Sequence, residues 1–287
     1  MTLRDLIKLC YRFVRAVIVR VFRYVFVDPW ARIDASARSD RVGKVTARTA
    51  TLVTCLTAAL MLVLLRFVVM DPAFQSTVAQ GTIDAAYALS EPLGIWLDPY
   101  HRLLLSLAWV AGSVTCYFVL PALVVRLVFG LKLRDFYLTP HAYFRHLPFY
   151  ALLFLPVGLA VLAVAHTPNF QAHYPFYDDA MGWPDRIAWE LGYALQFFGL
   201  EFFFRGFMLR GVVAELGSMG VMVMVVPYCM IHFGKPLPEC LGSILSGLVL
   251  GTLAMDTKSI WGGVTIHVAV AWLMDGASLW LKAHAAS

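Results

Sequence analysis

The sequence predicts an all-α fold, a polytopic membrane helix bundle of about seven spans with an amino-terminal amphipathic helix at the membrane interface. Hydrophobic residues make up 60% of the 287 positions and charged residues only 14%, whereas a soluble domain carries about 25% charged residues. The mean hydropathy is +0.73. Because the apolar residues gather into runs close to the roughly 20 residues that cross a bilayer, we expect a single multi-helix membrane domain.

Residues 1–48 are predicted to form a basic amphipathic helix followed by a linker. Eleven of the 23 Lys and Arg residues precede Thr49, and in the first part of this region they alternate with apolar residues at helical spacing. Such a helix lies along an anionic leaflet, so we expect anionic lipid as a partner. Nucleic-acid binding is the weaker alternative, and no nucleic-acid partner is expected. The helix is expected to end at Asp28-Pro29-Trp30.

Seven apolar segments follow the basic region, the fifth and sixth of which are short. They are residues 50–70, 103–128, 147–166, 187–209, 219–233, 241–255 and 259–281. The first three spans with their loops form a second predicted region, residues 49–186. The last four spans form the third, residues 187–287, which we expect to be the catalytic unit.

The distribution of basic residues predicts the orientation of the chain. Residues 71–101 and 167–185 contain no Lys or Arg, whereas Lys132, Arg134 and Arg145 lie together between the second and third spans. Because basic residues favour cytoplasmic loops, we expect the amino terminus in the cytoplasm. The prediction is an integral multi-pass protein of the bacterial cytoplasmic membrane.

Three polar residues interrupt the apolar segments of the third region: Glu201, His232 and His267. Ionisable side chains are costly inside a bilayer and usually mark a functional site. At the helical rise of about 1.5 Å per residue, Glu201 and His267 would lie roughly 12 Å from the cytoplasmic end of their spans, and His232 about 20 Å from the start of its own. All three can therefore meet near the middle of the membrane.

A carboxylate and two imidazoles at that depth fit the hydrolysis of a peptide bond. Glu201, shielded from bulk water, can act as general base on a water molecule that His232 shares. His267 can stabilise the oxyanion that forms when the water attacks a carbonyl. Arg205 lies one helical turn after Glu201, so an ion pair between them can orient the carboxylate.

These segments resemble the CPBP family of intramembrane proteases, which includes the CAAX prenyl proteases. The family pattern is Glu-Glu-x-x-x-Arg, then Phe-x-x-x-His, then His-x-x-x-Asn. It corresponds here to Leu200–Arg205, to Tyr228–His232 and to the segment that begins at His267, within residues 187–283. The resemblance implies a metal-free, glutamate-type endopeptidase that trims the carboxyl-terminal end of a lipid-modified or membrane-anchored protein.

The chain departs from the family pattern at two positions. Leu200 stands where the first Glu of the pair is expected, and Ala271 stands where the Asn is expected. Two interpretations stay open at this point. Either Glu201 has taken over the catalytic role, as in a myxosortase-like branch with a single Glu, or the chain is a homologue without activity.

Three further residues are candidates for supporting roles. Asp275, two turns after His267, can replace the polar function of the missing Asn. Tyr228 stands at the Phe position of the second motif. Glu190 lies three turns before Glu201 on nearly the same helix face, where it can pair with Arg186 or line a water path.

The sequence leaves other functions open. Glu201 and Arg205 can form a structural ion pair, His232 can anchor a helix end, and His267 can be a packing residue, so the alternative is a non-catalytic membrane scaffold or a transporter-like protein. No cofactor is expected, and the five scattered cysteines do not have zinc-site spacing. A zinc ion held by the carboxylate and two imidazoles nevertheless remains chemically open.

Overall fold

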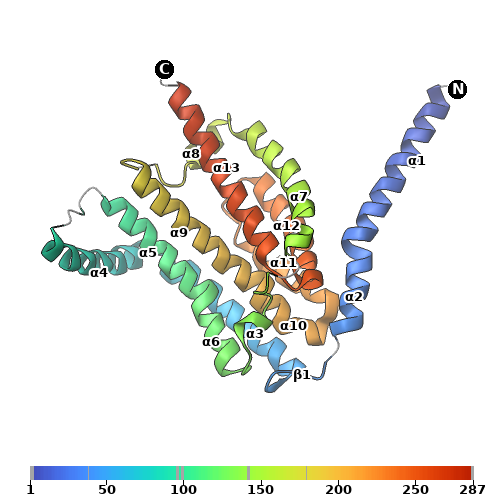
Figure 1. The fold of residues 1–287 in the computed structure, drawn as a ribbon, viewed down its shortest axis with the longest axis horizontal. Coiled ribbons are helices and arrows are strands. Elements are labelled where there is room, and N and C mark those ends of the chain that lie inside the picture. The colour runs from blue at the N-terminus through green and yellow to red at the C-terminus, as the bar shows by residue number, and fades with distance from the viewer. Residues whose placement is uncertain are drawn as a thin grey trace.

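The predicted all-α membrane bundle is confirmed. The computed structural model describes residues 3–37, 39–94, 97, 100–140, 143–178 and 180–285, and among them helices account for every long element (Figure 1). Within these described residues, six helical stretches are long and apolar enough to cross a membrane. They are Ala47–Val69, His101–Leu127, Tyr143–Val164, Trp183–Met230, Leu237–Thr257 and Trp261–His284. The chain is thus an integral multi-pass protein by length and composition, and the amino-terminal helix is not among these spans.

The first three stretches match the predicted spans closely. They consist of α3 (Ala47–Leu64) with the π-helix Leu65–Val69, α5 (His101–Val114) continued through the π-helix Thr115–Val119 into α6 (Leu120–Leu127), and α7 (Tyr143–Val164). Each lies within a few residues of its prediction because an apolar run bounded by polar residues fixes both ends of a span.

The fourth and fifth predicted spans lie in one helical stretch of 48 residues, Trp183–Met230. It contains α9 (Trp183–Glu201), the π-helix Phe202–Met208, α10 (Leu209–Leu216) and α11 (Gly220–Met230). The chain leaves helical geometry at Gly217, whose φ is +57°. There a Cβ would overlap the side chain of Asp34, and after this turn α11 packs back against α10 and the π-helix.

The sixth and seventh spans are α12 (Leu237–Thr257) and α13 (Trp261–Ala285). The prediction of a short sixth segment was wrong, because α12 extends over 21 residues. Its first turn contains Pro238, which usually breaks a helix, and Glu239, which is charged, so hydropathy alone does not assign this turn to a span. Proline is compatible with the first turn of a helix, because the backbone N–H that it lacks would have no acceptor within the helix at that position.

The predicted end of the amino-terminal helix at Asp28-Pro29-Trp30 was also wrong. Helix α1 (Leu3–Phe22) continues through the π-helix Arg23–Val27 into α2 (Asp28–Ala37). The backbone N–H of Asp28 donates to the carbonyl of Arg23, five residues earlier. Because this wider turn precedes Pro29, the proline falls in the first turn of α2, where it is tolerated.

Four further elements lie in the predicted linker and in the segments between the predicted spans. Strands β1 (Arg41–Val42) and β2 (Val45–Thr46) form a hairpin in the predicted linker. Helices α4 (Pro72–Ser90) and α8 (Pro168–His173) lie in the two segments without basic residues. Asp71 accepts a hydrogen bond from the N–H of Ala73 at 3.0 Å and so caps α4. Positions 95, 96, 98, 99 and 179 of those segments lie outside the described residues.

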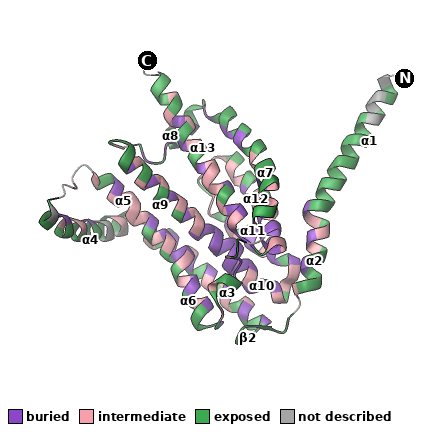
Figure 2. Ribbon diagram, viewed as in Figure 1, coloured by how far each residue is buried: buried purple, intermediate pink, exposed green. Residues whose placement is uncertain are grey.

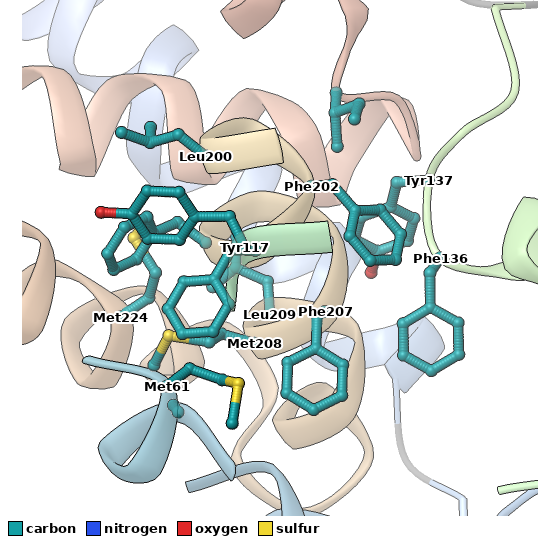
Figure 3. Close-up of a cluster of buried hydrophobic side chains, with 14 of the residues drawn as sticks. Met61, Tyr117, Phe136, Tyr137, Leu200, Phe202, Phe207, Met208, Leu209 and Met224 are labelled. Carbon is teal, nitrogen blue, oxygen red and sulfur yellow. The ribbon is translucent and has the colours of Figure 1, made fainter. Parts of the chain in front are cut away.

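The largest apolar core surrounds the π-helix Phe202–Met208, in which every residue is buried (Figure 2). Leu200 belongs to this core and lies with Tyr117 and Phe202 in the cluster that Figure 3 shows. Helix α9 packs between α5 and α13 (Figure 1). The site residues at the end of α9 are therefore carried by the most densely buried part of the molecule.

Helix α2 packs against α12, which lies more than 200 residues later in the sequence. The Arg32 guanidinium donates two hydrogen bonds to Asp256 at 2.9 and 2.7 Å. The indole N–H of Trp30 donates to the Thr252 hydroxyl at 2.9 Å. These contacts tie the first predicted region to α12 in the third, so the amino-terminal segment is packed on the region that carries the candidate site.

Candidate active site

Glu201 and Arg205 form an ion pair that is fully removed from solvent. Glu201 is the last residue of α9, and Arg205 lies in the π-helix that follows. Both side chains are 0% exposed, and Arg205 Nη1 lies 3.2 Å from Glu201 Oε1. Residues four apart share a helix face, and the pairing offsets part of the cost of burying each charge. The ion pair expected between Glu201 and Arg205 is therefore present in the structure.

His267 contacts the same carboxylate from α13. Its Nδ1 lies 2.6 Å from Glu201 Oε1, and its ring stacks on Phe197 with 5.6 Å between centroids. Close approach of the two helices depends on Gly263, one turn before His267, because a Cβ there would overlap the Glu201 carboxylate. A Cβ on Gly262 would likewise overlap the Tyr150 ring. Gly263 is therefore the sequence signal for the approach of α13 to α9, and Gly262 for the approach of α13 to α7.

Tyr228 touches both partners of Glu201. Its hydroxyl lies 2.9 Å from His267 Nε2, and the Arg205 guanidinium lies over its ring, 4.0 Å from the centroid. The hydroxyl also lies 3.5 Å from the Ser246 hydroxyl on α12. Sequence reasoning placed Tyr228 in a supporting position and missed Ser246, for which the sequence carries no signal.

His232 lies in the turn after α11, beside Tyr228. Its Nδ1 lies 2.8 Å from the Tyr228 carbonyl oxygen, and the two rings meet edge to face at 4.9 Å. Since a carbonyl only accepts, Nδ1 carries the proton of a neutral ring and Nε2 keeps its lone pair. In the described part of the chain, no hydrogen bond or ion pair joins His232 to Glu201 or His267.

The other predicted supporting residues lie away from the carboxylate. Asp275 accepts a hydrogen bond from the Phe176 N–H at 3.1 Å, and no direct bond to His267 is found among the described residues. Arg186 donates to the Tyr177 carbonyl at 2.7 Å, and no ion pair with Glu190 is found in that part of the structure. Glu190 and Asp275 each keep one buried carboxylate oxygen without a hydrogen-bond partner among the described residues.

The two positions that depart from the family pattern are apolar and packed. Leu200 is 6% exposed in the core around the π-helix. Ala271 is 4% exposed beside Trp189 and Tyr193. Neither position can supply a polar group to the site, so the chemistry depends on Glu201 and its neighbours.

The assembled groups suit proton transfer at a buried carboxylate. Within the described residues, neither Glu201 oxygen has an aligned hydrogen-bond donor, although Arg205 and His267 lie within ion-pair distance. A buried acceptor with unused capacity is costly to a fold and is a feature of functional sites. The described residues contain no group of three or more His, Cys, Asp or Glu side chains that could hold a metal ion.

Comparison with known proteins relates part of the chain to a described family. Residues 183–273 match the family model described as type II CAAX prenyl endopeptidase Rce1-like, whereas no curated protein and no solved structure matches the chain. The matched segment contains Glu201, Arg205, Tyr228, His232 and His267. It confirms the resemblance to the CAAX prenyl endopeptidases and the predicted class, a CAAX-protease-like membrane protease. The match lends no support to a myxosortase branch.

Proposed function

We propose that this protein is an intramembrane peptidase that uses water activated by Glu201 to cleave near the carboxyl-terminal end of a lipid-modified or membrane-anchored protein. The observation that carries the proposal is the fully buried Glu201 carboxylate, held between Arg205 and His267. The substrate class is taken from the family that the segment resembles, which is described as a type II CAAX prenyl endopeptidase.

In this proposal Glu201 is the general base. Water attacks the scissile carbonyl, one of its protons passes to Glu201, and the same proton then passes to the amine that leaves when the C–N bond breaks. The lone pair on His232 Nε2 accepts a hydrogen bond from the attacking water and so orients it. Arg205 keeps the carboxylate charged and in place.

The geometry suggests an exchange of the roles expected for His267 and Tyr228. Both ring nitrogens of His267 already have neighbours, Glu201 Oε1 and the Tyr228 hydroxyl, so we assign His267 the positioning of Glu201. When His267 carries two protons beside the carboxylate, its Nε2–H donates to the Tyr228 oxygen. The Tyr228 O–H is then free to donate to the oxyanion.

Two reporter peptides test the proposal on the full chain reconstituted in liposomes. Both contain a cysteine followed by a three-residue tail, and only one has a prenyl group on the cysteine. We expect the protein to release the tail from the prenylated peptide, and Glu201→Gln to slow release by at least about 100-fold. Release of neither tail by the unaltered protein would overturn the substrate class.

A non-catalytic scaffold is the second candidate function, favoured by the apolar packing of Leu200 and Ala271 at two positions where the family pattern has polar residues. It predicts that Glu201→Gln leaves any processing of a bound partner unchanged. The reporter assay with both peptides therefore separates the two candidates.

A further inference from the structure

A second concave surface, away from Glu201, has the character of an anion site. The cavity has a volume of about 300 Å³ and is lined by residues from α2, β1, α10, the end of α12 and the segment 134–139. That volume is at the lower end of the range for small-molecule sites. It lies at the end of the bundle that carries the β1–β2 hairpin, opposite α8 and the carboxyl terminus (Figure 1).

The wall of this cavity is strongly cationic. Arg41, Arg134, Arg210 and Lys258 all line it, against a single acidic residue, Asp135. Asp135 already accepts a hydrogen bond from the Lys132 N–H and lies 3.9 Å from Arg134. Four cations brought together from four segments repel one another, so the arrangement favours an anion that neutralises them.

Two of the cations have unused binding capacity. In the described part of the chain, neither Arg210 nor Lys258 lies within ion-pair distance of a carboxylate. The Arg210 guanidinium lies 5.9 Å from the centre of the Phe136 ring, which limits its freedom. A planar guanidinium held in this way is suited to bind a phosphate through two hydrogen bonds.

The apolar part of the cavity lies beside the charges. Ile33 and Met255, each 3% exposed, line it together with the cations. Another cavity provides a contrast, because it is lined by Arg48 together with Asp40 and Glu215 and has no excess of positive charge. An apolar floor with a cationic rim fits a phosphate group that is attached to an apolar body.

We propose that the cavity between α2, α10 and α12 binds a phosphate group, either the headgroup of an anionic phospholipid or a free phosphate. The site is separate from the basic helix α1, which is predicted to contact the lipid surface by its whole length. It is also independent of the proposed peptidase function, since none of its lining residues touches Glu201 or His267.

Lipid retention by the full chain in detergent tests this proposal, measured by native mass spectrometry with phosphatidylglycerol or phosphatidylcholine added. We expect selective retention of phosphatidylglycerol, weakened about 10-fold by Arg210→Gln and similarly by Lys258→Asn. Asparagine suits the backbone at Lys258, whose φ is +54°. Arg210→Lys keeps the charge but loses the planar contact, so its retention should lie between those of Arg210→Gln and the unaltered protein, which separates the loss of charge from the loss of the two-hydrogen-bond contact.

Two further arms complete the test. The matched control is Arg145→Gln on the exposed start of α7, which removes a cation outside both the cavity and the basic helix and should leave selective retention unchanged. Inorganic phosphate added without lipid reports the second source: if it raises the melting temperature of the unaltered protein but not of the cavity variants, the ligand is a free phosphate. Equal retention of phosphatidylglycerol and equal response to phosphate in the cavity variants and the unaltered protein would overturn the proposal.

Discussion

Gly263→Ala is a small change that should displace the Glu201 carboxylate. A Cβ at position 263 would overlap Glu201 Oε2 and would lie 2.6 Å from the carboxylate carbon. Glu201 is fully buried on the other side against Arg205, so the carboxylate cannot move without breaking one of its two ion pairs. The added methyl group therefore pushes either α13 or the Glu201 side chain away from the site.

The magnitude follows from the cost of overpacking and of misplacing a catalytic group. Overpacking a dense interior costs about 1–3 kcal/mol of unfolding free energy, which a domain of ordinary stability survives. A displacement of about 1 Å at a reacting group costs about 100-fold in rate. We therefore expect Gly263→Ala to fold and to release the tail of the prenylated reporter about 100-fold more slowly.

Gly276→Ala on the same helix is the matched control, because a Cβ there has no neighbour within 4 Å. It should raise helix stability by about 0.5–1 kcal/mol, as expected for Gly to Ala in a helix, and leave the rate unchanged. Each variant is assayed for tail release and for melting temperature. A Gly263→Ala protein as active as the Gly276→Ala protein would refute the placement of Glu201 against α13.

Two further predictions concern the partners of Glu201. Arg205→Met leaves the buried carboxylate without its guanidinium and should lower the unfolding free energy by about 3–5 kcal/mol; a change below 1 kcal/mol in denaturant unfolding would contradict the buried ion pair. Tyr228→Phe keeps the ring beneath Arg205 but removes the hydroxyl near His267, and should lower kcat about 100-fold with little change in KM. An unchanged kcat for this variant would show that the Tyr228 hydroxyl takes no part in the reaction.

The membrane architecture was predictable because hydropathy reports directly on burial in lipid. Each predicted span overlaps a helix, although the fifth extends past the end of α11 at Met230 into the turn that contains His232. The Asp71-Pro72 pair at the start of α4 also carried a usable signal, a capping residue followed by a first-turn proline. The continuation of the amino-terminal helix past Pro29 was not predictable from propensity, since it depends on the π-helical turn Arg23–Val27 that precedes the proline.

The composition of the site was predictable, but its internal contacts were not. Helical rise gave similar depths to Glu201 and His267, yet rise alone does not fix the rotation of a helix about its axis. Gly263, one turn before His267, decides that contact, because it lets α13 approach the end of α9 closely. Tyr228 differs from phenylalanine by one hydroxyl, and only the fold shows that this hydroxyl meets His267.

The rate of tail release by Glu201→Gln, compared with Glu190→Gln in the same liposome preparation, tests the central claim most directly. Glu190 lies on the same helix and also has a buried carboxylate oxygen, so it controls for the loss of a carboxylate in α9. The account predicts a kcat at least about 100-fold lower for Glu201→Gln and a nearly unchanged kcat for Glu190→Gln. Equal rates for the two variants would contradict the assignment of Glu201 as the group that activates water.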